Sequence, residues 1–204
     1  MNIYQKYKTS FNGFPCHLPQ TIERPESYSA LEALHNTPGI ARGLGCSYGD
    51  AALNQNRRII LTERLDRFLE FDETRGILCA EAGISLAKIL TVIVPRGWFL
   101  PVTPGTMQVT LGGCVAADVH GKNHLVEGAF GQHVLSLTLA TANDPAVVCS
   151  PTKNPELFWA TLGGMGLTGL IGTVTIQLKP IKSALMHVQT YVADFFLIKI
   201  RMNH

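Results

Sequence analysis

The strongest periodic pattern in the 204-residue chain lies between residues 85 and 97. Large aliphatic side chains recur there at the spacing of one helical face, at Leu86, Ile89, Leu90 and Ile93. Ser85 precedes them as a suitable N-cap, and Pro-Arg-Gly at residues 95–97 ends the run. The pattern therefore predicts an amphipathic helix over residues 86–94.

Short apolar and alternating runs predict strands on both sides of this helix. The expected strands are residues 58–61, 67–72, 76–82, 133–142, 146–149 and 170–178. Helices are expected at residues 27–34 and 157–162, and a further helix begins at Thr110. Asn154 and Pro155 suit the N-cap and first position of the second of these helices. The chain therefore mixes helices and strands along its length.

Composition narrows the function classes. Hydrophobic residues make up 46% and charged residues 16% of the chain, which favours a compact fold over disorder. The formal net charge of +2 gives no electrostatic reason to expect nucleic acid as a partner. The five cysteines are widely spaced and form no Cys-x-x-Cys pair, so we expect reduced thiols and a cytoplasmic protein. The longest apolar run, residues 89–95, is too short to cross a bilayer.

A glycine-rich loop, ARGLGCSYGDA, occupies residues 41–51 and follows a short apolar run. Its glycines make successive backbone N–H groups accessible, as a phosphate or pyrophosphate requires. The spacing of Gly43, Gly45 and Gly49 is not that of a Rossmann dinucleotide fingerprint. A tight surface loop without a ligand is the alternative.

A second unusual stretch, LPVTPGTMQVTLGGCVAADVHGKNH, occupies residues 100–124. It combines a Pro-Gly turn, a Gly-Gly pair and a polar cluster, and we interpret it as one wall of a cofactor site. His120, His124 and Glu127 superficially resemble a metal site, but they lack the His-Glu-x-x-His order and Lys122 adds positive charge between them. Lysine, imidazole and amide groups all donate hydrogen bonds, so an anionic or electron-rich ligand suits the cluster better than a metal.

Hydrolase chemistry has little support. Ser47 and Ser85 lack a Gly-x-Ser-x-Gly context. Cys114 has no activating partner nearby in the sequence.

Three motifs together carry a resemblance to a known family. They are RGLGCSYGDAALN, GWFLPVTPGTMQVTLGGCVAADVHGKNH and PELFWATLGGMGLTGLIGTVTIQL. In this order they resemble the PCMH-type FAD-binding domain of the vanillyl-alcohol-oxidase and p-cresol-methylhydroxylase flavoprotein superfamily. The sequence Asp-Val-His-Gly-Lys-Asn-His is most similar to that of the decaprenylphosphoryl-ribose oxidase group, with sugar-lactone oxidases next. The resemblance covers roughly residues 20–180.

The resemblance implies an α+β fold with two lobes and extended FAD between them. The small α/β lobe would span residues 21–105 and the larger lobe, with a mainly antiparallel sheet, residues 106–180. Residues 1–20 would form a lead-in. Residues 181–204 end in an apolar run without turn-forming residues. They would begin a truncated region related to a substrate domain.

The resemblance also implies positions for the cofactor. Residues 41–51 would wrap the pyrophosphate, residues 105 and 110–113 would line FAD from the other lobe, and residues 117–120 would approach the flavin. One backbone contact is expected after the Gly-Leu-Thr-Gly run. The cofactor-binding residues expected are Ala41, Arg42, Gly43, Leu44, Gly45, Cys46, Ser47, Tyr48, Gly49, Asp50, Ala51, Gly105, Thr110, Leu111, Gly112, Gly113, Ala117, Asp118, Val119, His120 and Ile171.

The activity implied is hydride transfer from a CH–OH group of a sugar, sugar lactone or polyprenyl-phosphate sugar to flavin N5. Lys122 would stabilise a substrate oxygen or phosphate, and His120 would contact the flavin. Many relatives carry a flavin-linked histidine where this chain has Cys46, so we expect non-covalent FAD. The alternative is an FAD-binding module without catalysis. A polyprenyl substrate would imply a peripheral position on the inner face of the membrane.

Overall fold

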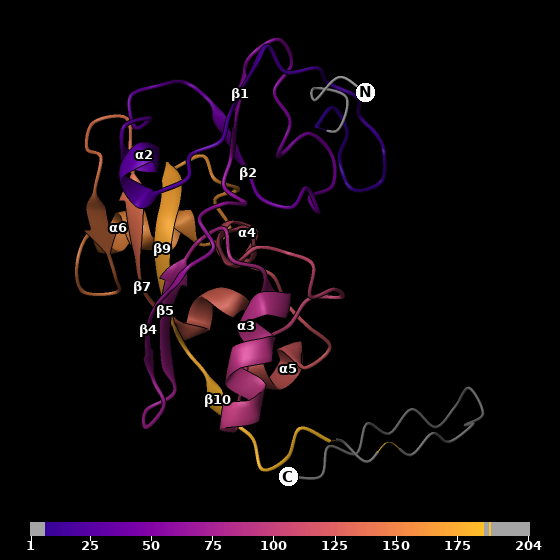
Figure 1. Ribbon diagram of the computed structural model, residues 1–204, viewed down its shortest axis with the longest axis vertical. Coiled ribbons are helices and arrows are strands. Elements are labelled where there is room, and N and C mark those ends of the chain that lie inside the picture. Colours follow the sequence, from indigo (N-terminus) through magenta and orange to yellow (C-terminus); the bar gives the residue numbers. More distant parts are fainter. Residues whose placement is uncertain (1–6, 186–187, 189–204) are drawn as a thin grey trace.

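The computed structural model describes residues 7–185 and 188 and has the expected α+β architecture (Figure 1). Its largest sheet has five strands in the order β4-β5-β9-β7-β8, and all neighbours pair antiparallel. The strands are β4 (Phe68–Asp72), β5 (Ile77–Glu81), β9 (Leu170–Gln177), β7 (Val134–Ala140) and β8 (Val147–Cys149). The strands predicted from the sequence are therefore present, with ends that differ by a few residues.

A smaller parallel sheet has the order β1-β3-β2 and lies beyond one end of the large sheet (Figure 1). It consists of β1 (Thr21–Glu23), β3 (Arg58–Leu61) and β2 (Ile40–Arg42). Three consecutive residues of the central strand, Ile59, Ile60 and Leu61, are fully buried. A continuous apolar run is what a strand covered on both faces requires.

The predicted amphipathic helix is α3 (Leu86–Ile93), and its Ser85 cap accepts a hydrogen bond from the Lys88 N–H at 3.1 Å. A short 3-10 turn, η1 (Val94–Arg96), follows and ends at Gly97, whose φ of 80° is left-handed. The buried face of α3 joins Leu78, Ala80, Val174 and Ile176 of the large sheet in one core. The helix therefore forms because its apolar stripe covers that sheet.

The remaining elements are short. They are α2 (Tyr28–Glu32), β6 (Trp98–Phe99), α4 (Leu111–Ala116), α5 (His124–Glu127), η2 (Phe130–His133), α6 (Pro155–Thr161) and β10 (Lys179–Pro180). Helix α2 is shorter than the eight residues its pattern suggested, and its Tyr28 ring packs where Gly172 of β9 leaves space. No helix within the described residues is long and apolar enough to span a membrane.

The chain passes between the two sheets earlier than the expected lobe boundary at residue 105. Strands β4 and β5 precede that boundary, yet β5 pairs with β9 from Ile77 opposite Gln177 to Glu81 opposite Thr173. The large sheet is thus built from both expected lobes, because this pairing joins residues almost a hundred positions apart. The expected region 181–204 falls mostly outside the described residues.

Gly83 follows β5 and lies against residues 62–65, where the chain passes from the small sheet to the large one. A Cβ atom there would be 1.7 Å from the carbonyl oxygen of Thr62 and 2.8 Å from that of Leu65. The Gly83 N–H also donates to the Leu65 carbonyl at 2.9 Å. The two backbones can approach this closely only without a side chain.

We therefore expect Gly83→Ala to lower the free energy of unfolding by roughly 3 kcal/mol or more, because the backbone at Thr62 must move. The measurement is urea denaturation followed by circular dichroism. Gly105→Ala is the matched control, since a Cβ atom at Gly105 meets nothing within 4 Å. Equal stability of the two variants would contradict the close approach.

Candidate functional site

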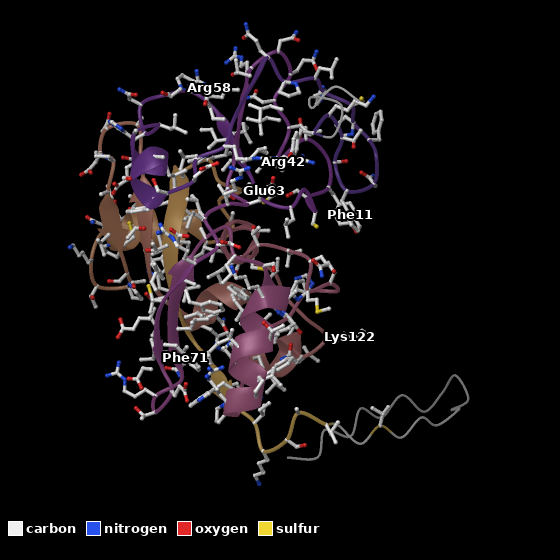
Figure 2. All side chains as sticks on the ribbon, viewed as in Figure 1. Phe11, Arg42, Arg58, Glu63, Phe71 and Lys122 are labelled. Carbon is white, nitrogen blue, oxygen red and sulfur yellow. The ribbon has the colours of Figure 1, made fainter. Side chains whose placement is uncertain are left out.

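The first glycine loop is folded around Arg42, the last residue of β2. This side chain is only 6% exposed, and it donates to the carbonyl oxygens of Ala52 at 3.1 Å and Thr9 at 2.9 Å. Burial lowers the pKa of its guanidinium. Gly45, with φ of 77°, passes so close that a Cβ atom would lie 2.4 Å from the guanidinium. The resemblance assigned Arg42 to the cofactor site, but its side chain supports the loop and lines neither cavity described below. Figure 2 marks its position.

The loop leaves backbone donors available. Within the described residues, no hydrogen bond has a backbone N–H of residues 44–49 as its donor. Successive N–H groups on a loop above a buried cation favour an anionic ligand. This agrees with the sequence-based interpretation of the loop as a phosphate-binding surface.

The second wall of the site, the stretch at residues 100–124, does not present free backbone donors as the first loop does. Helix α4 begins at its N-cap Thr110, whose Oγ1 accepts from the Gly113 N–H at 3.1 Å. The N–H groups of Leu111 and Gly112 donate to the carbonyl oxygens of Ile84 and Ala82, at 2.8 Å and 2.7 Å. All three donors of the first turn are already paired inside the protein. This wall therefore contributes shape and small side chains, while the first loop contributes the donors.

The two walls touch at two places. A Cβ atom on Gly43 would lie 2.4 Å from Thr110 Oγ1, so only glycine permits this approach. Cys46 Sγ donates to the Gln108 carbonyl oxygen at 3.0 Å. These contacts connect the loop after β2 to the segment before α4 and fix the width of the space between them.

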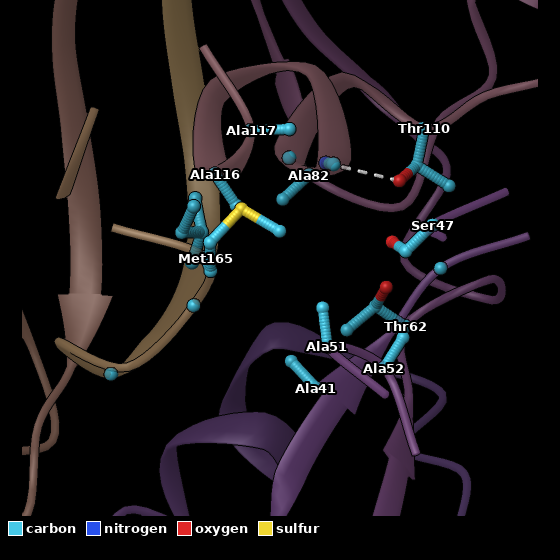
Figure 3. A pocket seen from close by; sticks show the side chains of 16 residues that line it. Ala41, Ser47, Ala51, Ala52, Thr62, Ala82, Thr110, Ala116, Ala117 and Met165 are labelled. Atoms are coloured by element: carbon cyan, nitrogen blue, oxygen red, sulfur yellow. Dashed lines mark hydrogen bonds between the residues drawn. The ribbon is translucent and has the colours of Figure 1, made fainter. Parts of the chain in front are cut away.

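Two neighbouring cavities lie along this junction. The smaller is about 80 Å³ and the larger about 530 Å³, a volume typical of small-molecule sites. The smaller is lined by Ala41, Gly43, Ser47, Ala51, Ala52, Thr62, Ala82, Thr110, Gly112, Gly113, Ala116, Ala117, Met165, Gly166, Gly169 and Ile171 (Figure 3). The larger is lined by Phe11, Gly43, Leu44, Gly45, Cys46, Ser47, Tyr48, Ala52, Pro104, Gly105, Thr106, Val109, Thr110, Gly113, Cys114, Ala117, Val119 and Met165. Gly43, Ser47, Thr110 and Gly113 belong to both, so the cavities form one elongated cleft.

Among the described residues, no charged side chain lines either cavity. A buried ion would therefore have to be stabilised by backbone dipoles rather than by a salt bridge. An elongated ligand with an anionic portion beside the loop and an uncharged portion in the larger cavity suits this cleft.

A third segment, which the sequence analysis did not assign to the site, closes the cleft from the side of α4. Met165 has a left-handed φ of 52°, and its N–H donates to the Ala116 carbonyl oxygen at 2.8 Å. Figure 3 shows its side chain reaching between α4 and the loop that carries Ala41 and Ala51. The glycine-rich run at residues 163–169 was the available signal for this segment. Ile171, which the resemblance did assign, lines the smaller cavity.

Several expected site residues do not line the cleft. Gly49 and Asp50 are exposed outside it, and Leu111 is buried in the core. Asp118 has a left-handed φ of 41°, and its carboxylate accepts from the Gly131 N–H at 2.7 Å. Its observed contact holds the turn after α4 against η2.

The polar cluster of residues 120–124 lies on the surface next to Val119, which lines the larger cavity. The rings of His120 and His124 meet edge-on with centroids 5.3 Å apart. Lys122 is exposed and forms no ion pair or side-chain hydrogen bond within residues 7–185. Glu127 pairs instead with Lys179. The described part of the chain contains no group of three or more His, Cys, Asp or Glu side chains placed to hold a metal ion.

The two cysteines of the larger cavity are held in the thiol form. Burial raises the pKa of Cys46, and the nearby Arg42 charge opposes this only in part. Burial raises the pKa of Cys114 to about 12. Neither sulfur is prepared to act as a nucleophile near neutral pH, because the thiolate is the reactive species.

The fold and this cleft define a protein that binds an extended nucleotide-type cofactor between two glycine-rich walls. Residues 18–150 match the FAD binding domain family, and the chain belongs to that family. FAD is therefore its cofactor, as the three motifs predicted. The glycine cradle and the free N–H groups of the first loop fit its pyrophosphate.

Longer oxidoreductases are similar to this chain. It is 42% identical over 167 residues to decaprenylphosphoryl-beta-D-ribose oxidase of Mycolicibacterium smegmatis, a match that covers 81% of this chain and 36% of the relative. L-gulonolactone oxidase of Bos taurus is 30% identical, with 79% and 36% covered. L-galactono-1,4-lactone dehydrogenase of Arabidopsis thaliana is 25% identical, with 91% and 30% covered. The chain thus spans about a third of the length of these relatives.

Thr110 offers a direct test of the junction between the walls. Thr110→Val keeps the shape but removes the hydroxyl that caps α4, so we expect a loss of about 1 kcal/mol in unfolding free energy. Thr110→Ser keeps the cap and should remain within a few tenths of a kcal/mol of the wild type. Thermal and urea denaturation measure both. A valine variant as stable as the serine variant would show that the cap does not matter.

Proposed function

We propose that the chain is the cofactor-binding part of an FAD-linked oxidoreductase that removes a hydride from a CH–OH group of a sugar-type substrate. The observation that carries this proposal is the uncharged cleft with free backbone donors along one wall. It suits a ligand with a pyrophosphate at its centre and a neutral ring system at one end. The sugar or sugar lactone class rests on the names of the similar enzymes. A polyprenyl-phosphate sugar is the variant suggested by the first of them.

Different residues of the cleft would contact different parts of FAD. The N–H groups of residues 44–48 would donate to the pyrophosphate, while Gly105, Thr110 and Gly113 would bound the cofactor from the opposite wall. Ala117 and Val119 would contact the flavin end, which would occupy the larger cavity that Val119 lines. Bound FAD supplies the redox chemistry, since its flavin accepts the hydride. The protein supplies orientation and exclusion of water.

Lys122 and His120 remain the proposed catalytic side chains. They are two residues apart at the edge of the larger cavity, beside Val119. The ammonium group of Lys122 has no partner within the described residues, so it can approach a substrate oxygen or phosphate without breaking an ion pair. The imidazole of His120 can donate to or accept from a group at the flavin end.

Non-covalent attachment of FAD is also part of the proposal. Cys46 donates its S–H to Gln108, and its raised pKa disfavours the thiolate that a covalent flavin bond would need.

A cytoplasmic location remains a prediction, as does peripheral membrane contact.

The first experiment adds FAD to the purified chain under anaerobic conditions and then adds sugars, sugar lactones and a polyprenyl-phosphate sugar in turn. We expect a yellow complex whose visible absorbance bleaches with one substrate class, and whose flavin is released by acid precipitation. Flavin that stays on the precipitated polypeptide would refute non-covalent attachment. A yellow complex that no substrate bleaches would support the alternative, an FAD-binding module without catalysis.

Lys122→Ala should lower the rate of flavin reduction by about tenfold or more, because a charge that stabilises a developing oxyanion is lost. FAD affinity should not change, since Lys122 lies outside the lining of both cavities. Stopped-flow absorbance and FAD titration measure the two quantities. Lys153→Ala, at an exposed lysine between β8 and α6, is the control. Reduction rates that agree in both variants would remove Lys122 from the mechanism.

A further inference from the structure

The segment before β1 lies against the first glycine loop. The Phe11 N–H donates to the Ser47 carbonyl oxygen at 3.1 Å, and the buried Arg42 donates to the Thr9 carbonyl oxygen at 2.9 Å. An isolated bridge between Thr9 and Cys16 closes the segment into a turn. These backbone contacts fix where the side chain of Phe11 projects.

Phe11 and Tyr48 form an aromatic pair at the larger cavity. Their ring centroids are 5.7 Å apart with an interplanar angle of 87°, an edge-to-face arrangement. Both residues line the cavity, yet Phe11 is 57% and Tyr48 69% exposed. Figure 2 shows Phe11 at the outer edge of the molecule, beyond Arg42. Each ring thus has an open surface that could cover part of a bound group.

The surroundings of this pair indicate what that group is. Leu44, Val109 and Val119 also line the larger cavity, and no charged side chain in the described part of the chain does. Phosphates would accept from the free N–H donors of the loop, whereas a neutral ring system gains from apolar and aromatic contacts. The pair therefore matches a planar, uncharged part of the ligand.

We propose that Phe11 and Tyr48 form an aromatic edge that packs against the isoalloxazine ring of FAD. Phe11 becomes a cofactor-positioning residue supplied by the N-terminal segment, although the sequence motifs place nothing there. This inference rests on the proposed FAD function. It adds that affinity for the ring system depends on Phe11, a residue outside the glycine-rich motifs.

The test uses the 204-residue chain and compares FAD with ADP, which carries the pyrophosphate but no flavin. Phe11→Ala should weaken FAD binding about tenfold and leave ADP binding unchanged, because only FAD offers a ring to the aromatic edge. Phe14→Ala is the matched control, since Phe14 is three residues away and 75% exposed but does not line either cavity. Titration followed by flavin fluorescence measures FAD, and displacement of FAD measures ADP.

Phe11→Leu removes the aromatic ring but keeps a large apolar side chain. This variant should weaken FAD binding while keeping the melting temperature of the wild type. Tyr48→Phe should raise the fluorescence of bound flavin, because a phenol quenches an excited flavin in contact with it and a phenyl ring does not.

The outcomes distinguish a failure of the aromatic edge from a failure of the proposed FAD function. A wild-type chain that binds no FAD refutes both. A wild type that binds FAD while Phe11→Ala and Phe14→Ala behave alike refutes only the aromatic edge. Equal weakening of FAD and ADP by Phe11→Ala would also overturn it, since that result means that the loop itself was displaced.

Discussion

The contact between Gly43 and Thr110 is the constraint on which the cleft depends. Thr110 lies against the space left by the missing side chain at Gly43, caps α4 and forms a bridge with Ser85, the residue that caps α3. One buried threonine thus connects the loop after β2 with two helices that pack on the large sheet. Both cavities are lined by Gly43 and Thr110, so their shape follows from how closely these two residues approach.

Arg42 allows the first loop to hold its shape without charged groups inside the cleft. Its guanidinium is bonded to two backbone carbonyl oxygens, on Ala52 and Thr9, which belong to the two segments that flank the loop. A buried cation paired with carbonyl oxygens rather than a carboxylate keeps much of its field. That field lies directly beneath the free N–H groups. The loop therefore attracts a phosphate through backbone dipoles and a hidden charge.

The parts of the fold that are determined locally could be predicted from the sequence. The caps Ser85 and Thr110 and the first-turn proline Pro155 mark helices because their effects reach only one turn. The predicted Asn154 cap is wrong, since its side chain makes no capping hydrogen bond and donates to the Val148 carbonyl oxygen instead. The partners of β5 could not be predicted, since the pairing with β9 depends on residues far along the chain. The division into lobes at residue 105 therefore did not anticipate one sheet built from both sides of that boundary.

The candidate site shows the same limit. Glycines at positions 43 and 113 could be assigned because close approach of a backbone leaves a recognisable sequence mark. Arg42 was assigned to cofactor binding, but its side chain is bonded to backbone carbonyl oxygens and lines neither cavity, because nothing in a motif shows which way a side chain points. Phe11 and Met165 were missed, since each comes from a segment that reaches the cleft only through tertiary contacts.

The paired N–H donors of α4 affect which segments can recognise the cofactor and which remain for catalysis. Since the N–H groups of Leu111, Gly112 and Gly113 are already used, polar recognition of the cofactor falls to the loop after β2. Residues 120–124 lie outside the lining of both cavities and carry the side chains suited to a substrate. In the proposed function, a change at Lys122 therefore affects the substrate step alone, whereas a change at His120 also affects the flavin end of the cofactor.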